Sequence, residues 1–186
     1  MRERPILFSG EMVRAITDGK KSMTRRVVLL PNNAMDAAWI MCHCPYGQPG
    51  DRLWVRETWK TCRPDSFAVR FRSDNSTMIV PSHIPVEYGA PWSDGASWRP
   101  SIYMPRWASR LTLEVTAVRV EGLQDITNDD AMAEGVHAES GPVRGVSSLA
   151  AAQFAVLWDS INGNRPGCAW ADNPWVWVVS FKRVNA

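Results

Sequence analysis

Residues 110–120 constrain the possible fold more than any other segment of the sequence. Apolar side chains occupy the odd positions from Leu111 to Ala117, and this period of two predicts a half-buried β-strand. Residues 52–59 and 175–183 have a similar character. Strands of this length must pair to satisfy their backbone groups, so we expect all three segments to be strands of one barrel.

Three segments with helical spacing are interleaved with these strands. We expect helices at residues 10–18, 128–134 and 148–161. Ser9 and Thr127 are suitable N-cap residues for the first two helices. Gly19 and Gly135 stand where those helices should end. The order of elements predicts an α+β fold, a small mixed β-barrel with flanking helices.

Composition limits the compartment and the partners of the chain. The net charge of +2 over 186 residues is too small for a protein that coats DNA, although it allows a local basic patch. Ten tryptophans indicate either a large aromatic core or a surface that stacks bases. The sequence has no apolar run typical of a signal peptide or a membrane span, so we expect a cytoplasmic protein without membrane contact.

The segment from Gly19 to Arg26 carries a motif, Gly-Lys-Lys-Ser-Met-Thr-Arg-Arg. It resembles the signature G-[KR]-K-[TS]-x-T-x-R of ASCH domains, relatives of the PUA fold of RNA-binding proteins, and the whole chain is similar to ASCH proteins of phages and prophages. The family's strand-opening turn, capped helix and last strand are matched by residues 49–53, 123–135 and 178–182. The resemblance implies one PUA-like domain over residues 1–186, with insertions at about 60–107 and 139–170.

The resemblance also implies an activity. The best-defined activity of the family is removal of the acetyl group from N4-acetylcytidine, and its catalytic lysine, threonine and glutamate fall on Lys21, Thr24 and Glu134. Arg26 matches the family arginine, whereas Arg25 stands where an apolar residue is common. We therefore expect a cofactor-free hydrolase of a modified nucleoside, with a threonine nucleophile, a lysine base and a glutamate proton shuttle. As cleft residues, the three should each contribute no more than about 1 kcal/mol to stability.

Further residues are assigned to substrate binding. Arg56, Glu57 and Trp59 lie close together in the expected strand over residues 52–59. Arginines interleaved with tryptophans are typical of surfaces that stack nucleobases, so we assign these three, with Arg25 and Arg26, to a modified nucleoside or RNA. The same pattern equally fits a solvated sheet face whose tryptophans lie under a loop.

Two other functions fit the same residues. The cleft is then either a non-catalytic site for RNA or single-stranded nucleic acid, or the centre of a small ribonuclease in which Lys21 and Glu134 act on a phosphodiester. A closed pocket around Lys21, Thr24 and Glu134 would indicate catalysis, and an open basic groove continuing past them would indicate binding. Cys42 and Cys44 are spaced too tightly for the usual zinc knuckle, so we expect no metal site.

Overall fold

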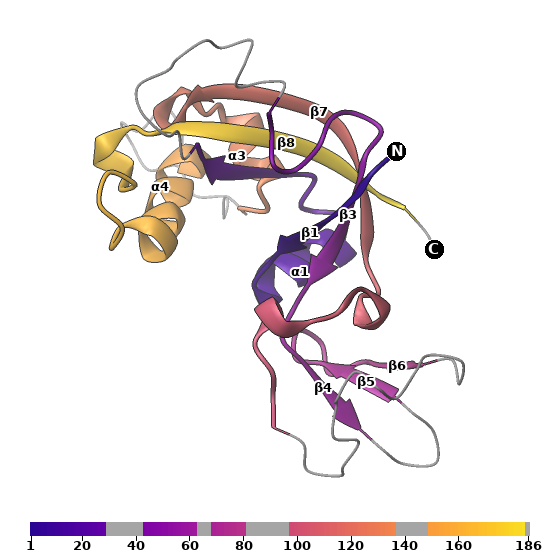
Figure 1. Ribbon diagram of the computed structural model, residues 1–186. Helices are drawn as coiled ribbons and strands as arrows, with labels where there is room; N and C mark the ends of the chain where they lie inside the picture. Colours follow the sequence, from indigo (N-terminus) through magenta and orange to yellow (C-terminus); the bar gives the residue numbers. More distant parts are fainter. Residues whose placement is uncertain (29–42, 63–67, 81–96, 137–148, 185–186) are drawn as a thin grey trace.

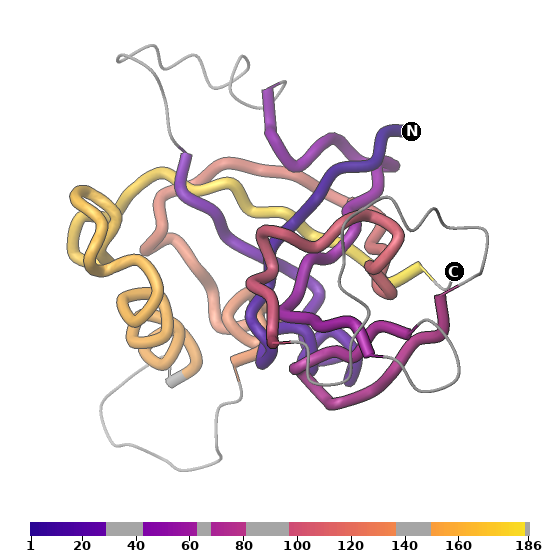
Figure 2. Tube along the Cα trace, turned by 60° about the horizontal axis from the view of Figure 1, so that its bottom comes forward, coloured from indigo at the N-terminus to yellow at the C-terminus, as the bar shows by residue number. Residues whose placement is uncertain are grey.

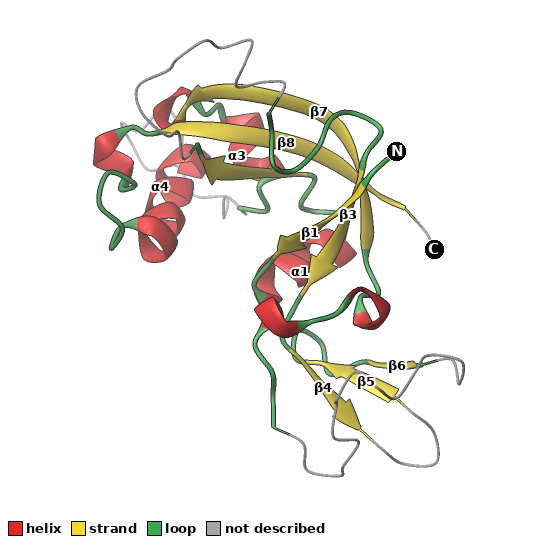
Figure 3. Ribbon diagram, in the orientation of Figure 1, coloured by secondary structure: helices red, strands yellow, loops and turns green. Residues whose placement is uncertain are grey.

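The computed structural model describes residues 1–28, 43–62, 68–80, 97–136 and 149–184. Within them the chain forms an α+β fold with two sheets (Figures 1 and 3). The five-stranded sheet has the order β1 (Glu3–Leu7), β3 (Arg52–Arg56), β7 (Thr112–Gly122), β8 (Trp175–Val184) and β2 (Met23–Val27). The three-stranded sheet has the order β4 (Trp59–Cys62), β5 (Ala68–Phe71) and β6 (Thr77–Ile79).

The helices lie close to the expected positions. They are α1 (Gly10–Thr17), α3 (Asn128–Ala133) and α4 (Leu149–Asn162), with 3-10 turns at Ser101–Tyr103, Arg106–Ala108, Leu123–Asp125 and Trp170–Asp172. The side chain of Ser9 accepts a hydrogen bond from the Met12 N–H at 3.3 Å, and that of Thr127 accepts one from the Asp130 N–H at 3.2 Å. Both predicted N-caps are therefore present. Among the described residues, no helix is long and apolar enough to span a membrane.

The long ribbon of β7 and β8 explains the pattern that dominates the sequence. Its register shifts between Val115 and Ala117, where one strand carries an extra residue. A shift of one residue exchanges the two faces of a strand. Accordingly the buried apolar residues up to Val115 are odd-numbered, whereas Val118 and Val120 pack against the core beyond the shift.

The expected closed barrel is not found among the described residues. The large sheet ends in β1 and β2, which form no backbone ladder with each other. The two edges are instead joined by a side chain, since Nη2 of Arg26 donates to the carbonyl of Leu7 at 2.7 Å. The α+β class is confirmed, and the described strands of the large sheet do not close into a barrel.

The expected single strand over residues 52–59 is also wrong. β3 ends at Arg56 and β4 begins at Trp59, in the other sheet. Between them Glu57 turns inward and is only 2% exposed, because its carboxylate is held by side chains from distant segments. Figure 2 shows the result, with the small sheet (magenta) and α4 (orange) at opposite ends of the molecule.

Candidate functional site

The ends of α1 and α3 bring Lys21 and Glu134 together. Each helix is followed by a glycine with positive φ, Gly19 at 73° and Gly135 at 89°. Their N–H groups bond back to the last turn at 3.1 and 2.9 Å, as in a Schellman motif. The chain turns sharply at both points, and Lys21 and Glu134 then form an antiparallel bridge.

The side chains of Lys21 and Glu134 form a buried ion pair. Nζ of Lys21 lies 2.6 Å from Oε2 of Glu134 and donates to the Glu134 carbonyl at 2.8 Å. The two side chains are 1% and 5% exposed. Burial lowers the pKa of Lys21 below its ordinary value, against the opposing attraction of the Glu134 carboxylate. A lysine in this position gives up its proton more readily than one in water.

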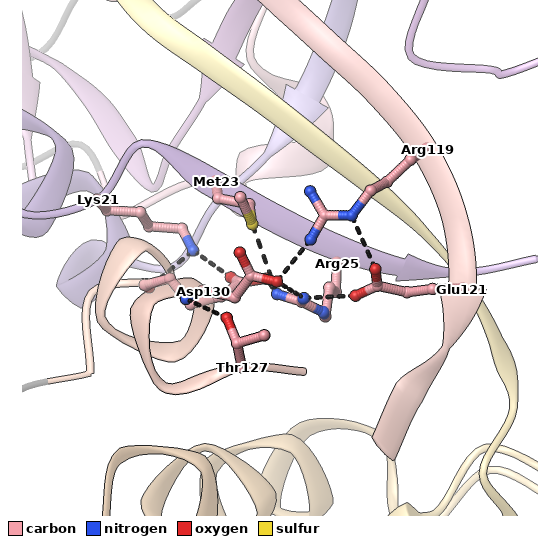
Figure 4. Close-up of polar contacts among 8 residues, drawn as sticks. Lys21, Met23, Arg25, Arg119, Glu121, Thr127 and Asp130 are labelled. Atoms are coloured by element: carbon pink, nitrogen blue, oxygen red, sulfur yellow. Dashed lines mark hydrogen bonds and ion pairs between the residues drawn. The ribbon is translucent and has the colours of Figure 1, made fainter. Parts of the chain in front are cut away.

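Arg25 extends this pair into a larger cluster that the sequence did not predict (Figure 4). Nη2 of Arg25 lies 2.6 Å from Oε1 of Glu121 and 2.7 Å from Oδ2 of Asp130, and Arg119 binds the same two carboxylates. We call the set the β2 cluster; its members are Lys21, Arg25, Arg119, Glu121, Asp130 and Glu134. Three cations and three carboxylates give it a formal charge of zero.

Two atoms of the β2 cluster are buried without a hydrogen-bond partner in the described structure. They are Nε of Arg25 and Oε1 of Glu134. Nη1 of Arg25 lies 3.5 Å from that same Oε1, too far for a good hydrogen bond. Buried polar atoms are almost always paired, and these two, like Nε of Arg4, Arg52 and Arg56, are exceptions in the described residues.

Both residues line a small hollow beside the free edge of β2, which we call the inner hollow. Its volume is about 30 Å³. It is bounded by β2, by Met12 of α1 and by the face of α4 that carries Phe154 and Trp158. Arg25 and Glu134 form its polar side.

Two larger hollows adjoin the inner one. The seam hollow, of about 390 Å³, lies between the edge strands β1 and β2 and shares Arg25, Arg26 and Trp158 with the inner hollow. The second, of about 250 Å³, lies beside α1 and shares Met12 and Glu134 with it. Shallow space therefore continues on both sides of the ion pair.

Thr24 also lines the inner hollow, and it is 1% exposed. Thr24 and Arg25 are neighbours in β2, so their side chains leave opposite faces of the strand. Within the described chain, both hydrogen bonds of the Lys21 amine go to Glu134 and none goes to Thr24. Thr24 and Glu134 therefore line one hollow, and Lys21 is paired with Glu134.

Arg26 lies at the opening between the inner and seam hollows. Besides its bond to the Leu7 carbonyl, its guanidinium lies 5.3 Å from the centre of the Phe8 ring. Tyr46 borders the same seam, and burial raises the pKa of its hydroxyl against the opposing effect of Arg26. Arg26, like Arg25, is thus a predicted binding residue whose cationic side chain borders the seam hollow.

The other predicted binding residues lie elsewhere, because the chain leaves the large sheet after β3. Arg56 donates to the carbonyl of Ile102 at 3.2 Å and lies over the ring of Trp54. Glu57 and Trp59 are 2% and 1% exposed, inside the region of the small sheet. None of the three borders the three hollows. A ring as deeply enclosed as Trp59 offers no face for stacking a base.

Glu57 belongs to a second buried group of charges, which we call the Arg110 cluster. Its members are Glu57, Ser73, Asp74, Ser76 and Arg110. Nε and Nη2 of Arg110 bind the two oxygens of Glu57 at 2.9 and 3.1 Å, and Nη1 binds Asp74 at 2.8 Å. Ser73 and Ser76 accept further bonds from the same guanidinium. This cluster joins the turn after β5 and the segment between β3 and β4 to Arg110, two residues before β7.

No group of three or more metal-ligating side chains occurs in the part of the chain that the structure describes. Cys44 is buried, and burial raises the pKa of its thiol, which opposes formation of the thiolate that zinc requires. Cys42 lies outside the described residues.

Comparisons with known proteins do not assign a family. No family model matches the sequence, and no curated protein matches it. Two solved structures are similar. Protein EF3133 from Enterococcus faecalis V583, of family DUF984, has a TM-score of 0.46 and 8% identity, over 99% of this chain and 81% of that one. Hypothetical protein PH0355 has a TM-score of 0.42 and 10% identity, over 99% and 100%. Neither likeness is close enough to support an argument, so membership of the ASCH family stays a prediction.

Proposed function

We propose that this chain is a hydrolase that removes an acyl group from the N4 amine of a modified cytosine, as a free nucleoside or in RNA. The observation that carries the proposal is the buried pair of Lys21 and Glu134, whose glutamate lines the same hollow as Thr24. Burial lowers the pKa of Lys21, and enzymes use this device to make a lysine serve as a base near neutral pH. In this proposal the fold is a PUA-like ASCH domain in the cytoplasm.

The pair suits the two proton transfers of amide hydrolysis. With the shared proton on Glu134, Lys21 is a neutral amine and Glu134 is a neutral acid. The amine accepts the proton of the Thr24 hydroxyl as its oxygen attacks the acyl carbon, and an acyl-threonine ester forms. Glu134 gives its proton to the departing N4 nitrogen, which leaves as the free amine of cytosine. Water then hydrolyses the ester, which releases the carboxylic acid and restores the hydroxyl.

This sequence of steps requires one rearrangement. The Lys21 amine bonds to Glu134 in the unliganded chain and must turn toward Thr24 when the substrate arrives. A substrate amide that accepts the proton of Glu134 would weaken that bond and release the amine. Catalytic hydrogen bonds often form only in the complex.

A second function has its own observation. The hollows continue on both sides of the ion pair, toward α1 and along the seam between β1 and β2. A groove that passes beyond the pair is what we expect of a module that binds single-stranded nucleic acid without cleaving anything. Arg26 and Arg165 border the seam and would face the backbone of such a strand.

The decisive experiment is an assay of acid and cytidine released from N4-acetylcytidine by the purified chain. Thr24→Val should abolish release, because it removes the nucleophile and keeps the shape, and Thr24→Ser should retain a measurable part of it. Thr112→Val is the matched control, since Thr112 is also a buried strand threonine, 8% exposed, that borders none of the three hollows. Full activity in Thr24→Val would remove the nucleophile. Nucleic-acid binding by a parent protein without any hydrolysis would favour the binding module.

A further inference from the structure

We infer that the outer face of the small sheet is a docking surface for the phosphate backbone of a single strand of RNA. We call this surface the cationic face; its members are Lys60, Arg70, Arg72 and Trp98. The surface and its charge do not depend on the proposed function. The choice of RNA over DNA rests on that function, because phosphates are common to both.

The alternation of side chains along the strands sets the cations on one face. Val69 and Phe71 are both 0% exposed and pack inside the region of the small sheet. Neighbouring side chains of a strand leave opposite faces, so Arg70 and Arg72 lie on the other face, and both are exposed. Lys60 is the cross-strand partner of Arg70 and is partly exposed. Three cations therefore share this face.

No carboxylate neutralises these three cations in the part of the chain that the structure describes. None of the ion pairs there includes a member of the cationic face. The carboxylates of Glu57 and Asp74 are bound by Arg110 instead. The cationic face thus presents three positive charges to whatever lies against it.

The large sheet contains a cross-strand cation that is matched by an acid. There Lys182 lies opposite Glu114, and the two side chains form an ion pair at 3.0 Å. In the small sheet Lys60 lies opposite Arg70, and like charges in such positions destabilise the pairing of the strands. A ligand that supplies negative charge would remove that cost.

An aromatic ring holds two of the three cations in place. Trp59 and Arg99 form an antiparallel bridge, which brings the neighbouring Trp98 beside Lys60. The Lys60 amine lies 5.0 Å from the centre of the Trp98 ring, and the Arg72 guanidinium lies 5.9 Å from it. A contact of this kind orders the cationic side chain without cancelling its charge. Both cations therefore stay available to an anion.

A hollow connects the cationic face with the proposed site. It has a volume of about 520 Å³ and lies between the start of α1 and the small sheet, and we call it the sheet hollow. Arg14 and Arg72 line it, and Glu11 adds one carboxylate. It shares Ser9 and Glu11 with the hollow beside α1, which reaches Glu134. A strand bound to the cationic face can therefore continue toward the buried ion pair.

The arrangement of the charges favours a phosphate backbone over other anionic surfaces. Arg70 and Arg72 are two residues apart in extended chain, about 7 Å, so they can contact successive phosphates of an extended strand. A planar guanidinium forms two parallel hydrogen bonds to one phosphate. The cationic face also runs into the sheet hollow, which a chain of nucleotides can follow and a flat lipid bilayer cannot enter.

The test measures binding of oligouridylate of about twelve nucleotides by fluorescence anisotropy at a series of salt concentrations. Oligouridylate has no cytosine and no acyl group, so binding is measured apart from hydrolysis. Each neutralised phosphate of a single strand contributes about 0.7 to the slope of log K against log salt concentration. We expect Arg70→Gln and Arg72→Gln each to reduce this slope by about 0.7 and to weaken binding about 5-fold at about 0.1 M salt.

Arg183→Gln is the matched control. Arg183 is also an exposed strand arginine, but it belongs to β8 of the large sheet and borders none of the four hollows. Its loss removes the same charge and should leave affinity and slope unchanged. Arg70→Glu is a second variant, which sets a carboxylate opposite Lys60 as Glu114 is set opposite Lys182. It should resist urea at least as well as the parent and bind more weakly than Arg70→Gln.

Several results would overturn the inference. They are unchanged binding in both Arg70→Gln and Arg72→Gln, an equal loss in Arg183→Gln, or binding of a polyglutamate peptide of the same length as tight as that of oligouridylate. Binding that is lost in Arg165→Gln and kept in Arg70→Gln would place the strand in the seam and also overturn it. Tighter binding of oligothymidylate DNA than of oligouridylate would overturn the choice of RNA.

The same proteins separate this inference from the hydrolase proposal. Arg70→Gln should hydrolyse free N4-acetylcytidine as the parent does, because a nucleoside in the site does not extend to the small sheet, and it should hydrolyse acetylated RNA with a higher KM. Oligouridylate binding that depends on Arg70, in a parent without hydrolysis, would defeat the hydrolase proposal and leave the docking surface standing. Hydrolysis together with RNA binding that ignores Arg70 and Arg72 would do the reverse.

Discussion

The chain buries two groups of charges, and they differ in how completely they are satisfied. In the Arg110 cluster, all three guanidinium nitrogens donate hydrogen bonds to side-chain oxygens. In the β2 cluster, Nε of Arg25 and Oε1 of Glu134 have no hydrogen-bond partner among the described residues. Both clusters join segments distant in sequence, and both hold an arginine between carboxylates. Only the incomplete one borders the three hollows at the edge of the large sheet.

This difference is what we expect between a network with a structural role and one that also binds a ligand. A fully bonded buried network fixes the geometry of the segments it joins and has nothing left to offer a ligand. A network with an open donor and an open acceptor gives up some stability and retains the capacity to bind. Burial of charge alone therefore does not identify a functional site. The β2 cluster differs in two further respects, since it has unpaired buried atoms and borders the inner hollow.

The largest expected effect is the loss of the completed cluster. Arg110→Met removes the cation that binds Glu57 and Asp74, and leaves the Glu57 carboxylate, only 2% exposed, without its charge partner. Breaking a buried pair on one side costs about 3–5 kcal/mol. We expect a loss of that size in the free energy of unfolding, measured by urea denaturation, with the β2 cluster unaffected.

The matched control is Arg106→Met. Arg106 pairs with Glu3 at the surface, where the two side chains are 45% and 38% exposed, and such pairs contribute less than about 1 kcal/mol. Equal losses from the two substitutions would show that the Arg110 cluster does not hold the two sheets together.

The next effect tests the pair of Lys21 and Glu134. Lys21→Met leaves Glu134 buried with its neutralising amine removed, so we expect a loss of about 3 kcal/mol. Adding Glu134→Leu returns the cluster to zero formal charge and replaces the pair with apolar groups, which should restore stability to within about 1 kcal/mol of the parent. Hydrolysis should be lost in both proteins. Urea denaturation and the acetylcytidine assay on the same samples separate the two effects.

This expectation corrects the one drawn from the sequence. As cleft residues, Lys21 and Glu134 should contribute no more than about 1 kcal/mol each, but their side chains are 1% and 5% exposed. Recovery of activity in the double variant would contradict the proposed mechanism. A single variant as stable as the parent would contradict the pairing.

Local sequence signals account for most of the elements and for few of the contacts. The alternation before Ala117 and the caps at Ser9 and Thr127 predicted a strand and two helix starts that the structure contains. The interruption of the strand at Glu57 has no local sequence signal, because residues 52–59 have the pattern of one continuous strand. The interruption accompanies the hydrogen bond from Arg110, 53 residues away, to the Glu57 carboxylate. Long-range pairing of this kind overrides propensity.

The same limit applies to the site. The motif placed Lys21, Thr24 and Glu134 in one group, and in the structure Thr24 and Glu134 line one hollow while Lys21 is paired with Glu134. It did not predict that Arg25 is buried, because the carboxylates that bind it lie 96 and 105 residues further along the chain. The assignment of Arg25 to substrate binding now depends on its one unpartnered nitrogen.

A smaller effect is expected at the glycine that lets the two site residues meet. Gly135 has a φ of 89°, and a Cβ there would lie 3.3 Å from Cβ of Lys21 and 3.2 Å from that of Ala15. Gly19 has a φ of 73°, and a Cβ there would meet nothing within 4 Å. Each Gly→Ala change forces a left-handed conformation that costs about 1–2 kcal/mol.

The comparison of these two glycines isolates the crowding against Lys21. We expect Gly135→Ala to lose more stability than Gly19→Ala and also to reduce hydrolysis, because the added methyl displaces the lysine. Thermal unfolding and the acetylcytidine assay measure the two losses. If both variants lose the same stability and the same activity, the contact between Gly135 and Lys21 does not position the site.

The smallest effect concerns the pH dependence of the completed cluster. Burial alone would raise the pKa of Asp74, but hydrogen bonds from Arg110 and Ser76 lower it from 3.8 to about 2. A carboxyl whose pKa is depressed by folding stabilises the native state above its unfolded pKa, and that contribution is lost as the pH falls through the folded pKa. The Asp74 side chain is 33% exposed, so solvent screening should limit its contribution to about 1 kcal/mol.

Asp74→Asn should therefore be less stable than the parent from pH 7 down to pH 4. The difference in the free energy of unfolding should disappear between pH 4 and pH 2, in the window set by the shift of the pKa from 3.8 to about 2. Urea denaturation of both proteins at each pH cancels the titration of every other group. A difference that persists unchanged below pH 2 would mean that the Asp74 carboxylate is not held by Arg110, and that the Arg110 cluster is less complete than its hydrogen bonds indicate.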